Sequence, residues 1–358
     1  MTKTSPVSIA DDLSAESLLY AVNKSINYYK KLGNDKIFYF GSKAVTRNEL
    51  LKSHQLFAQA LAKYGLTQNF YDFIENNFDY YTSESAKVLV TGYFEASLNG
   101  SRTRSSKYKY PLYRKPNDLI SVKISDFFPD KPELPDTVRG RLAGDIVFKY
   151  YDREDIDYKN KLSNKNLEIV WVDDLLDSFF LHIQGSGIVY LDDGNKVRVN
   201  YASQNGHPYK AIGKYLVDNN YLKLEDASMQ SIRKVLSDNP ELQRKVLSWN
   251  PSYVFFREVN EGPVGSIGQV LTPLRSVALD KDIFPRGSIG ILKTKEPVVG
   301  RNNEISWKEV SRFVVNQDTG GAITGAGRVD YFMGHGEEAA QKAGVMKQAG
   351  NIFFILKK

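Results

Sequence analysis

The sequence predicts a mainly β protein that also carries helices, a fold of the α+β class. Three observations favour this class: helical periodicity fills the first 80 residues, strand-like patterns follow it, and a glycine-rich succession of strands and turns closes the chain. With 358 residues, of which 42% are hydrophobic and 25% charged, the chain is long enough for two domains with their own cores.

The N-terminal part predicts three helices. The first is expected over residues 12–32, with Gly33 ending it and one face formed by Leu18, Val22, Ile26 and Tyr29. A second helix is expected from Thr46 to Gly65, because Thr46-Arg-Asn-Glu49 fits a capping box. A third, short helix is expected over residues 68–77.

Strands and a second group of helices are expected after this region. The strands are predicted at residues 88–94, 145–150 and 167–172, and in a hairpin whose arms flank Asp192-Asp-Gly-Asn195. Helices are predicted near residues 209–219, 228–238 and 241–249. From Tyr253 onward the pattern is again strand and glycine turn, and the apolar set Tyr253-Val-Phe-Phe256 is expected in the core.

Composition excludes several kinds of chemistry. The chain has no cysteine, which removes disulfides, thiolate nucleophiles and cysteine zinc sites. The four histidines, His54, His182, His207 and His335, are too scattered to predict a metal cluster, so neither a metal nor a cofactor is expected. His182 alternates with apolar neighbours and is interpreted as an interior residue, whereas His207 either lines a cleft or caps a turn.

The net charge of +6 and the pI of about 9 favour a polyanionic partner. Residues 101–115 form the densest basic segment and interleave cations with Tyr108, Tyr110 and Tyr113. Such tyrosines can stack on nucleobases or pack on sugar rings, but an isolated basic loop is usually a solvated face, and nucleic acid is not expected. No run approaches eighteen apolar residues, so a membrane-spanning helix is not expected, and the first residues lack the pattern of a secretory signal.

Two carboxylates bracket a glycine-dense segment, Asp318-Thr-Gly-Gly-Ala-Ile-Thr-Gly-Ala-Gly-Arg-Val-Asp330. Glycines let a backbone turn sharply and approach a ligand closely. A carboxylate on such a segment can be partly buried beside a cleft, where desolvation or a second acid raises its pKa into the range useful for general-acid catalysis. Asp and Gly are also the residues of ordinary surface turns, so this segment alone leaves a hairpin open as the alternative.

Further motifs accompany this segment. Asp280 heads a turn that leads into a strand, and together with Asp318 and Asp330 it resembles the aspartate trio of the 3D domain, a small double-psi β-barrel. The other motifs, in chain order, are Val90-Thr-Gly-Tyr-Phe-Glu95, Tyr110-Pro-Leu-Tyr-Arg114, Phe179-Phe-Leu-His-Ile-Gln-Gly-Ser-Gly187, Asn205-Gly-His-Pro-Tyr209 and Asn250-Pro-Ser-Tyr-Val-Phe-Phe256. From about residue 85 to 358 the chain resembles the membrane-bound lytic murein transglycosylase A family.

The resemblance implies a discontinuous architecture, although no Pro/Gly/Ser linker locates the boundaries. Residues 1–105 and 252–358 are expected to form a double-psi β-barrel domain with N-terminal helices, and residues 106–251 an inserted β-rich domain that binds substrate across a groove. The family's partner is the glycan strand of peptidoglycan. The resemblance also implies a monomer in the bacterial cell envelope, with outer-membrane association where a lipid anchor is present.

The implied reaction is non-hydrolytic cleavage of the β-1,4 bond between N-acetylmuramic acid and N-acetylglucosamine, with formation of a 1,6-anhydromuramic end. Because the attacking O6 hydroxyl belongs to the sugar under attack, one acid suffices to donate and then to recover a proton. Asp330 matches the family's catalytic acid. Asp318 is expected to raise the pKa of Asp330, to orient it, or to bind a sugar hydroxyl, and Asp280 to fix a turn of the barrel.

Polar residues and glycines of these motifs are expected to bind the sugar chain. They are Thr91, Tyr93, Glu95, Gln184, Ser186, Gly187, Gly320 and Gly321, with Asp280 as a further candidate. Two other classes of protein stay open. Asp318-Thr-Gly resembles the motif of aspartic proteases, which need two such motifs where this chain has one, and a wall-binding module would hold glycan without cutting it.

Overall fold

The computed structural model describes residues 1–83, 86–300 and 304–358, which form two compact units. The barrel unit consists of Met1–Phe94 and Glu261–Lys358, and the insert unit of Glu95–Asn260. The domain crossings expected near residues 105 and 252 stay predictions. Among the described residues, no helix is both long enough and apolar enough to cross a bilayer.

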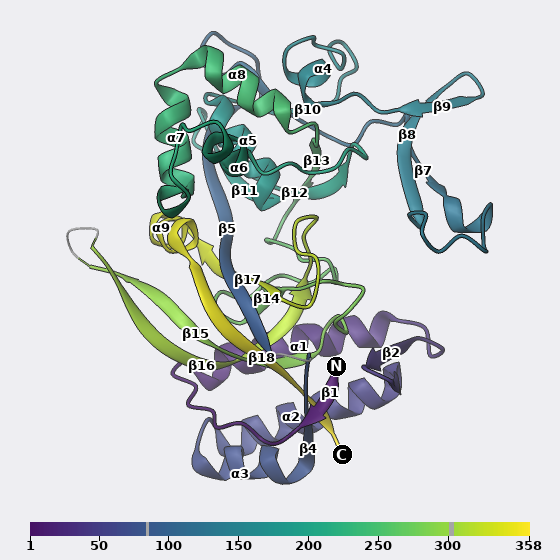
Figure 1. Ribbon diagram of the computed structural model, residues 1–358, viewed down its shortest axis with the longest axis vertical. Helices are drawn as coiled ribbons and strands as arrows, with labels where there is room; N and C mark the ends of the chain where they lie inside the picture. Colours follow the sequence, from purple (N-terminus) through teal and green to yellow (C-terminus); the bar gives the residue numbers. More distant parts are fainter. Residues whose placement is uncertain (84–85, 301–303) are drawn as a thin grey trace. The chain divides into compact units, whose positions relative to one another are not determined.

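The barrel unit has three helices in its N-terminal segment and strands in both of its segments (Figure 1). Its helices are α1 (Ala15–Lys31), α2 (Arg47–Tyr64), α3 (Gln68–Asn77) and α9 (Glu337–Val345). Its strands are β1 (Thr2–Thr4), β2 (Ile37–Phe40), β3 (Lys43–Thr46), β4 (Phe78–Thr82), β14 (Ser276–Ala278), β15 (Ile289–Val299), β16 (Ile305–Asp318), β17 (Arg328–His335) and β18 (Lys347–Lys357), together with the first half of β5 (Lys87–Ser101).

Six strands of this unit close into a barrel. β14 pairs in parallel with β16 and antiparallel with β17, and β16 continues through β15 to β18. β18 then pairs with β5, and β5 returns to β17, where the Leu89 N–H donates to the Gly327 carbonyl over 2.8 Å. A closed barrel has no open sheet edge, and its pleat points alternate side chains inward and outward. The predicted fold class, a β-barrel with N-terminal helices, is confirmed.

The N-terminal helices cover one side of this barrel. Thr46 and Glu49 form the predicted capping box of α2, and Gly65 ends that helix with its N–H on the Leu61 carbonyl. The buried face of α1 contains all four predicted residues. Phe57 of α2 and Phe70 of α3 pack edge-on against Phe313 of β16, with ring centres 5.2 and 5.8 Å apart, so the helices and the barrel share one hydrophobic core.

The insert unit combines a sheet with a helical layer. Its strands, beyond the second half of β5, are β6 (Tyr110–Tyr113), β7 (Leu119–Lys123), β8 (Thr137–Ala143), β9 (Ile146–Lys149), β10 (Glu168–Val172), β11 (Ser186–Leu191), β12 (Lys196–Gln204) and β13 (Val254–Val259). Its helices are α4 (Arg153–Asp157), α5 (Leu175–Gln184), α6 (Ile212–Asp218), α7 (Met229–Ser237) and α8 (Pro240–Trp249), with short 3-10 turns at Ile124–Asp126 and Leu224–Asp226.

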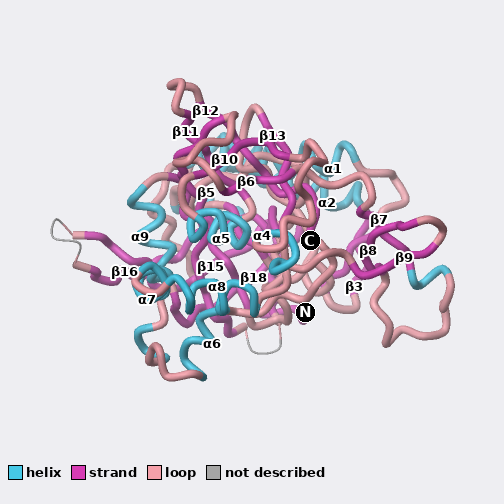
Figure 2. The backbone as a smooth tube through the Cα atoms, turned by 90° about the horizontal axis from the view of Figure 1, so that it is seen from above, coloured by secondary structure: helices cyan, strands magenta, loops and turns pink. Residues whose placement is uncertain are grey.

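Within the insert unit, the sheet order β5–β11–β12–β13 includes the predicted hairpin between β11 and β12. Strands β7 to β9 form a separate small sheet that extends away from the helices of the same unit (Figure 2). Helices α5 to α8 gather around a second core that contains Phe179, Leu216, Leu236 and Val246.

Two of the local structures that were not predicted are instructive. Residues 175–184 form helix α5, because an apolar run that is buried nearly all round does not reveal its period, and a strand and a buried helix then look alike. Strands β2 and β3 form a hairpin around Gly41, whose φ of +65° suits glycine. Both structures depend on tertiary packing more than on a local pattern.

Candidate active site

The two carboxylates of the glycine-dense segment lie on strands that flank the same short strand. Asp318 is the last residue of β16 and Asp330 is the third residue of β17. Ala278 of β14 pairs with Asp318 on one side and with Asp330 on the other. The barrel therefore holds both acids at one level, and both side chains are half-buried.

Asp318 accepts three hydrogen bonds. Its Oδ1 accepts from the backbone N–H groups of Ser266 and Thr319, each over 2.9 Å, and its Oδ2 accepts from the Tyr93 hydroxyl over 3.1 Å. Donors of this kind favour the ionised form of a carboxyl group. Burial raises the pKa of Asp318 to about 6, while these three hydrogen bonds lower it and oppose the rise.

Asp330 has a poorer set of donors. Its Oδ1 accepts one hydrogen bond, from the Thr91 hydroxyl over 2.8 Å, and the Arg328 Nη2 donates to that hydroxyl over 3.5 Å. Burial raises the pKa of Asp330 to about 6, and the negative charge of Asp318 adds to the rise. The Thr91 hydrogen bond and the positive charge of Arg328 lower it.

An apolar cluster beside the acids explains their desolvation. Tyr93, Leu271, Ala278 and Phe332 pack together, with the Tyr93 and Phe332 ring centres 5.2 Å apart. Phe332 follows Asp330 by two residues on β17, and Tyr93 follows Thr91 by two residues on β5, so each pair shares a face of its strand. A carboxyl group next to such a cluster loses water, which disfavours its charged form.

The structure shows what the other predicted residues of this segment do. Asp280 accepts hydrogen bonds from the N–H of Asp282 over 2.9 Å and from the N–H of Gly325 over 2.6 Å. These bonds hold two turns in place, which is a structural role. Gly325 has a φ of +83°, a backbone conformation that glycine adopts readily, which explains why a glycine occupies this position. A side chain on Gly321 would meet open space, and one on Gly320 would meet Ile323, so close approach of a ligand there stays a prediction.

The remaining predicted sugar-binding residues lie in the insert unit. Glu95 is 1% exposed and forms a 3.0 Å ion pair with Arg198, and Ser186 is buried at the start of β11. Packing requires glycine at position 187, because a Cβ atom there would lie 2.6 Å from the Leu181 side chain. Gln184 is half-buried at the end of α5. A role of these residues in glycan binding stays a prediction.

Other residues singled out in the sequence have internal partners. Tyr108 and Tyr113 are buried and so cannot offer their ring faces to bases. His182 lies inside the insert unit with its Nδ1 3.1 Å from an Nη of Arg153, and the Nε2 of His207 lies 2.7 Å from the Tyr150 carbonyl oxygen. Among the described residues, no group of three or more His, Cys, Asp or Glu side chains is arranged to hold a metal ion.

Ser266 and Arg328 are among the residues of the site that were missed in the sequence. Ser266 reaches Asp318 through a backbone N–H on a loop 52 residues away, and no local pattern indicates this contact. Arg328 lies two residues before Asp330 on β17 and therefore on the same face, but no strand was predicted there.

Comparison with known proteins agrees with this geometry. The MltA specific insert domain matches residues 89–257 and the 3D domain matches residues 275–356. Membrane-bound lytic murein transglycosylase A of Escherichia coli strain K12 is 33% identical over 271 residues, which are 75% of this chain and 65% of that protein. The chain thus spans slightly less than two thirds of that relative's length.

Solved structures resemble the whole chain. A membrane-bound lytic murein transglycosylase from Agrobacterium tumefaciens has a TM-score of 0.79 at 28% identity and covers 96% of this chain and 92% of its own. The structure of E. coli MltA with bound chitohexaose has a TM-score of 0.72 at 26% identity, covering 99% and 95%.

A closed barrel with paired acids and an MltA-type insert together define the class of protein, a 3D-domain protein with an MltA specific insert domain. The chain belongs to the membrane-bound lytic murein transglycosylase A family.

Proposed function

We propose that this protein is a lytic transglycosylase that cleaves the β-1,4 bond between N-acetylmuramic acid and N-acetylglucosamine in peptidoglycan and forms a 1,6-anhydromuramic end. The observation that carries the proposal is the unequal pair of acids on either side of Ala278. Asp318 has three donors and Asp330 has one, so Asp318 is the group that ionises first and Asp330 the group that keeps a proton.

The reaction uses Asp330 twice. The protonated carboxyl group gives its proton to the glycosidic oxygen as the bond between this oxygen and the muramic C1 breaks. The muramic O6 hydroxyl then bonds to C1, and its proton returns to the Asp330 carboxylate, so that no water is consumed. An intramolecular nucleophile has a high effective concentration when the ring is correctly distorted.

Thr91 and Tyr93 support this chemistry as positioning residues. Their hydroxyls are hydrogen-bonded to Asp330 and Asp318, respectively, which orients each carboxyl group on the barrel wall. The predicted contact of these two residues with sugar would use the remaining lone pairs of the hydroxyls and the edge of the Tyr93 ring. Glu95, Gln184, Ser186, Gly187, Gly320 and Gly321 are the further candidates for glycan binding.

The supporting comparisons also concern the partner and the location. The E. coli relative was solved with chitohexaose, an oligosaccharide of aminosugars, and the curated relative is named membrane-bound. We infer that this chain acts as a monomer on glycan strands in the bacterial envelope, with outer-membrane association through a lipid anchor where one is present. A protease is not favoured, because Asp330 does not lie in a second Asp-Thr-Gly motif.

Substitution of Asp330 by Asn tests the proposal. Asn keeps the shape of the side chain but has no transferable proton, so release of anhydro-muropeptides from purified sacculi, followed by mass spectrometry, should fall at least about a hundredfold. Binding to sacculi should persist. Reducing ends in place of anhydro ends would indicate a hydrolase, and binding without soluble product by the unsubstituted protein would indicate a wall-binding module. Retained turnover in Asp330→Asn would transfer the role of acid to another group, with Asp318 the nearest.

A further inference from the structure

One face of helix α8 in the insert unit carries a polar and aromatic stripe. Glu241, Arg244, Lys245, Ser248 and Trp249 recur at spacings of three and four residues, so they share that face. The opposite face is the apolar one, with Leu242, Val246 and Leu247 in the core. A polar stripe on a surface helix is ordinary, but this one includes Trp249, which is half-buried and so keeps part of its ring accessible beside the polar residues.

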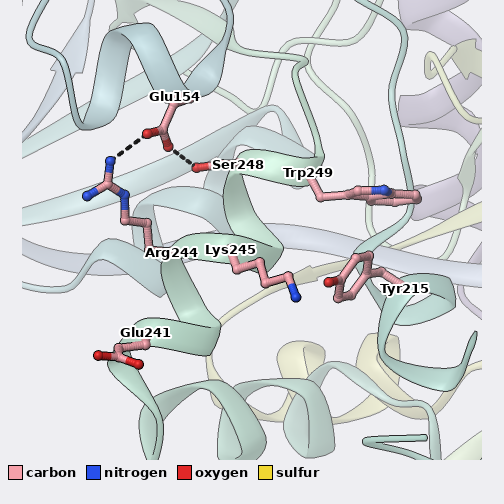
Figure 3. A pocket seen from close by; sticks show the side chains of 7 residues that line it. All are labelled: Glu154, Tyr215, Glu241, Arg244, Lys245, Ser248 and Trp249. Atoms are coloured by element: carbon pink, nitrogen blue, oxygen red, sulfur yellow. Dashed lines mark hydrogen bonds and ion pairs between the residues drawn. The ribbon is translucent and has the colours of Figure 1, made fainter. Parts of the chain in front are cut away.

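The stripe forms one wall of a pocket of about 470 Å³. Glu154 from α4 and Tyr215 from α6 complete the lining, so three helices of the same unit converge on it (Figure 3). A volume of this size suits one or two sugar rings and falls within the usual range of small-molecule sites. None of the lining residues belongs to the site around Asp318 and Asp330.

The two ends of the pocket differ in character. At one end Glu154 pairs with Arg244 over 2.5 Å and also bonds to the Ser248 hydroxyl, so the charge of Arg244 is already neutralised. At the other end the rings of Tyr215 and Trp249 lie 5.3 Å apart (Figure 3). The ammonium group of Lys210 lies 5.2 Å from the centre of the Trp249 ring and holds that ring in place.

Of the two cationic side chains that line the pocket, Arg244 is paired with Glu154 and Lys245 is the one left available. Its side chain extends toward the Tyr215 ring in Figure 3, and among the described residues no carboxylate lies within ion-pair distance of its ammonium group. An aromatic pair beside an exposed ammonium group suits a ligand that has an apolar ring face and a carboxylate next to it. A pyranose ring offers such a face through its axial C–H groups.

We propose that this pocket binds a carboxylate-bearing aminosugar unit of peptidoglycan, with the sugar ring against Tyr215 and Trp249 and the carboxylate on Lys245. The proposal rests on the proposed function for its substrate class. The carboxylate belongs either to the lactyl group of muramic acid or to an attached peptide. The pocket would hold a piece of the glycan other than the bond that Asp330 attacks, which would keep the protein on its polymeric substrate.

The test uses a sugar that cannot be cleaved at the proposed bond. The disaccharide N-acetylglucosaminyl-N-acetylmuramic acid contains the other linkage of the strand, so its binding does not depend on turnover. Trp249 reports binding by fluorescence once the two other tryptophans, Trp171 and Trp307, are replaced by Phe in the full chain. The probes are this disaccharide, the same disaccharide with its peptide, the free peptide, and neutral chitobiose.

Saturable change of Trp249 fluorescence is expected with at least one of the two carboxylate-bearing disaccharides, and at least about tenfold weaker binding is expected with chitobiose. Lys245→Gln should raise Kd about tenfold for the disaccharide that binds, whereas Lys196→Gln, which removes another exposed lysine on β12, should leave Kd unchanged. Attachment of the peptide converts the lactyl carboxylate into an amide. Tighter binding of the peptide-bearing form would therefore place the carboxylate on the peptide, and tighter binding of the peptide-free form would place it on the lactyl group.

Three results would overturn the proposal: equal Kd for Lys245→Gln and the parent protein, equal binding of chitobiose, or full binding of the free peptide alone. Because Lys245 is exposed, its substitution does not threaten folding. A failure of the proposed function would instead appear in the sacculus assay with Asp330→Asn, which does not involve this pocket.

Discussion

Arg328 and Asp318 act on the Asp330 carboxyl group in opposite directions. The negative charge of Asp318 raises the pKa of Asp330, whereas the positive charge of Arg328 lowers it. The Arg328 Nε is buried and, among the described residues, has no hydrogen-bond partner. Such a group contributes mainly through its charge, which keeps the proton of Asp330 transferable near neutral pH instead of fixing it.

Replacement of Arg328 by Gln should shift the pH dependence of catalysis. Loss of the positive charge raises the pKa of Asp330 above its present value of about 6, so the acid stays protonated to higher pH. The alkaline limb of kcat/KM against pH should move upward by about 0.5 to 1 unit.

Two controls separate this effect from general damage. Arg328→Lys retains a cation and should leave the alkaline limb near its original position. Lys295→Gln removes an exposed cation of β15 and should leave the whole profile unchanged. An alkaline limb that stays in place in Arg328→Gln would show that Arg328 does not act on the ionisation of Asp330.

At the scale of elements, the loop between β13 and β14 contacts the candidate active site. Gly265 allows the loop to lie against the end of β16, because a side chain there would be 2.4 Å from the Gln317 carbonyl oxygen. The N–H of the next residue, Ser266, donates to Asp318. The close approach at Gly265 and the support of Asp318 are therefore one structural feature.

Gly265→Ala should damage stability and catalysis together. The added methyl group must displace the loop or β16, which should lower the free energy of unfolding by about 1–3 kcal/mol. Withdrawal of the Ser266 N–H should lower kcat/KM at least about tenfold, since a charged hydrogen bond is lost. Urea unfolding and sacculus turnover measure the two effects.

Gly321→Ala gives the comparison for stability. Its methyl group would meet open space, so the free energy of unfolding should stay within about 0.5 kcal/mol of the parent value. Activity of this variant then reports separately whether glycan approaches Gly321. If Gly265→Ala has the same free energy of unfolding and the same sacculus turnover as the parent protein, the loop does not position Asp318.

The best-predicted elements are those whose sequence pattern is local to the element itself. The capping box at Thr46 and the bounds of α3 required no knowledge of the rest of the chain. The pairing of Ala278 with two strands is different, because it depends on how segments 40 and 52 residues away close into a barrel. The aspartates could thus be recognised from their motif, whereas the three donors around Asp318 and the apolar cluster that raises both pKa values could not.

At the scale of the molecule, the barrel unit must join two segments separated by the whole insert unit. A buried ion pair links them: the Arg275 Nη1 and Nη2 donate to the two carboxylate oxygens of Asp11 over 2.6 and 3.0 Å, and both side chains are 0% exposed. The same Asp11 oxygen that binds Nη1 also accepts from the Phe313 N–H over 2.8 Å. The N-terminal segment is thereby fixed to two parts of the barrel unit distant in sequence.

Asp11→Ala should therefore destabilise the barrel unit specifically. It leaves the Arg275 guanidinium buried without its counter-ion, which should lower the free energy of unfolding of this unit by about 3–5 kcal/mol. Trp307 lies in the barrel unit, and Trp171 and Trp249 lie in the insert unit. In a variant that keeps only Trp307, the urea midpoint of the Trp307 fluorescence change should shift to lower urea. In a variant that keeps only Trp249, the midpoint should stay in place when the insert unit unfolds independently.

Asp282→Ala removes an exposed carboxylate from the same unit and should leave both transitions in place. An unchanged Trp307 transition in Asp11→Ala would show that the N-terminal segment is not required to hold the barrel together. Equal shifts of both transitions would show that the two units unfold as one cooperative structure, because loss of an ion pair in one unit would then lower the stability of the other.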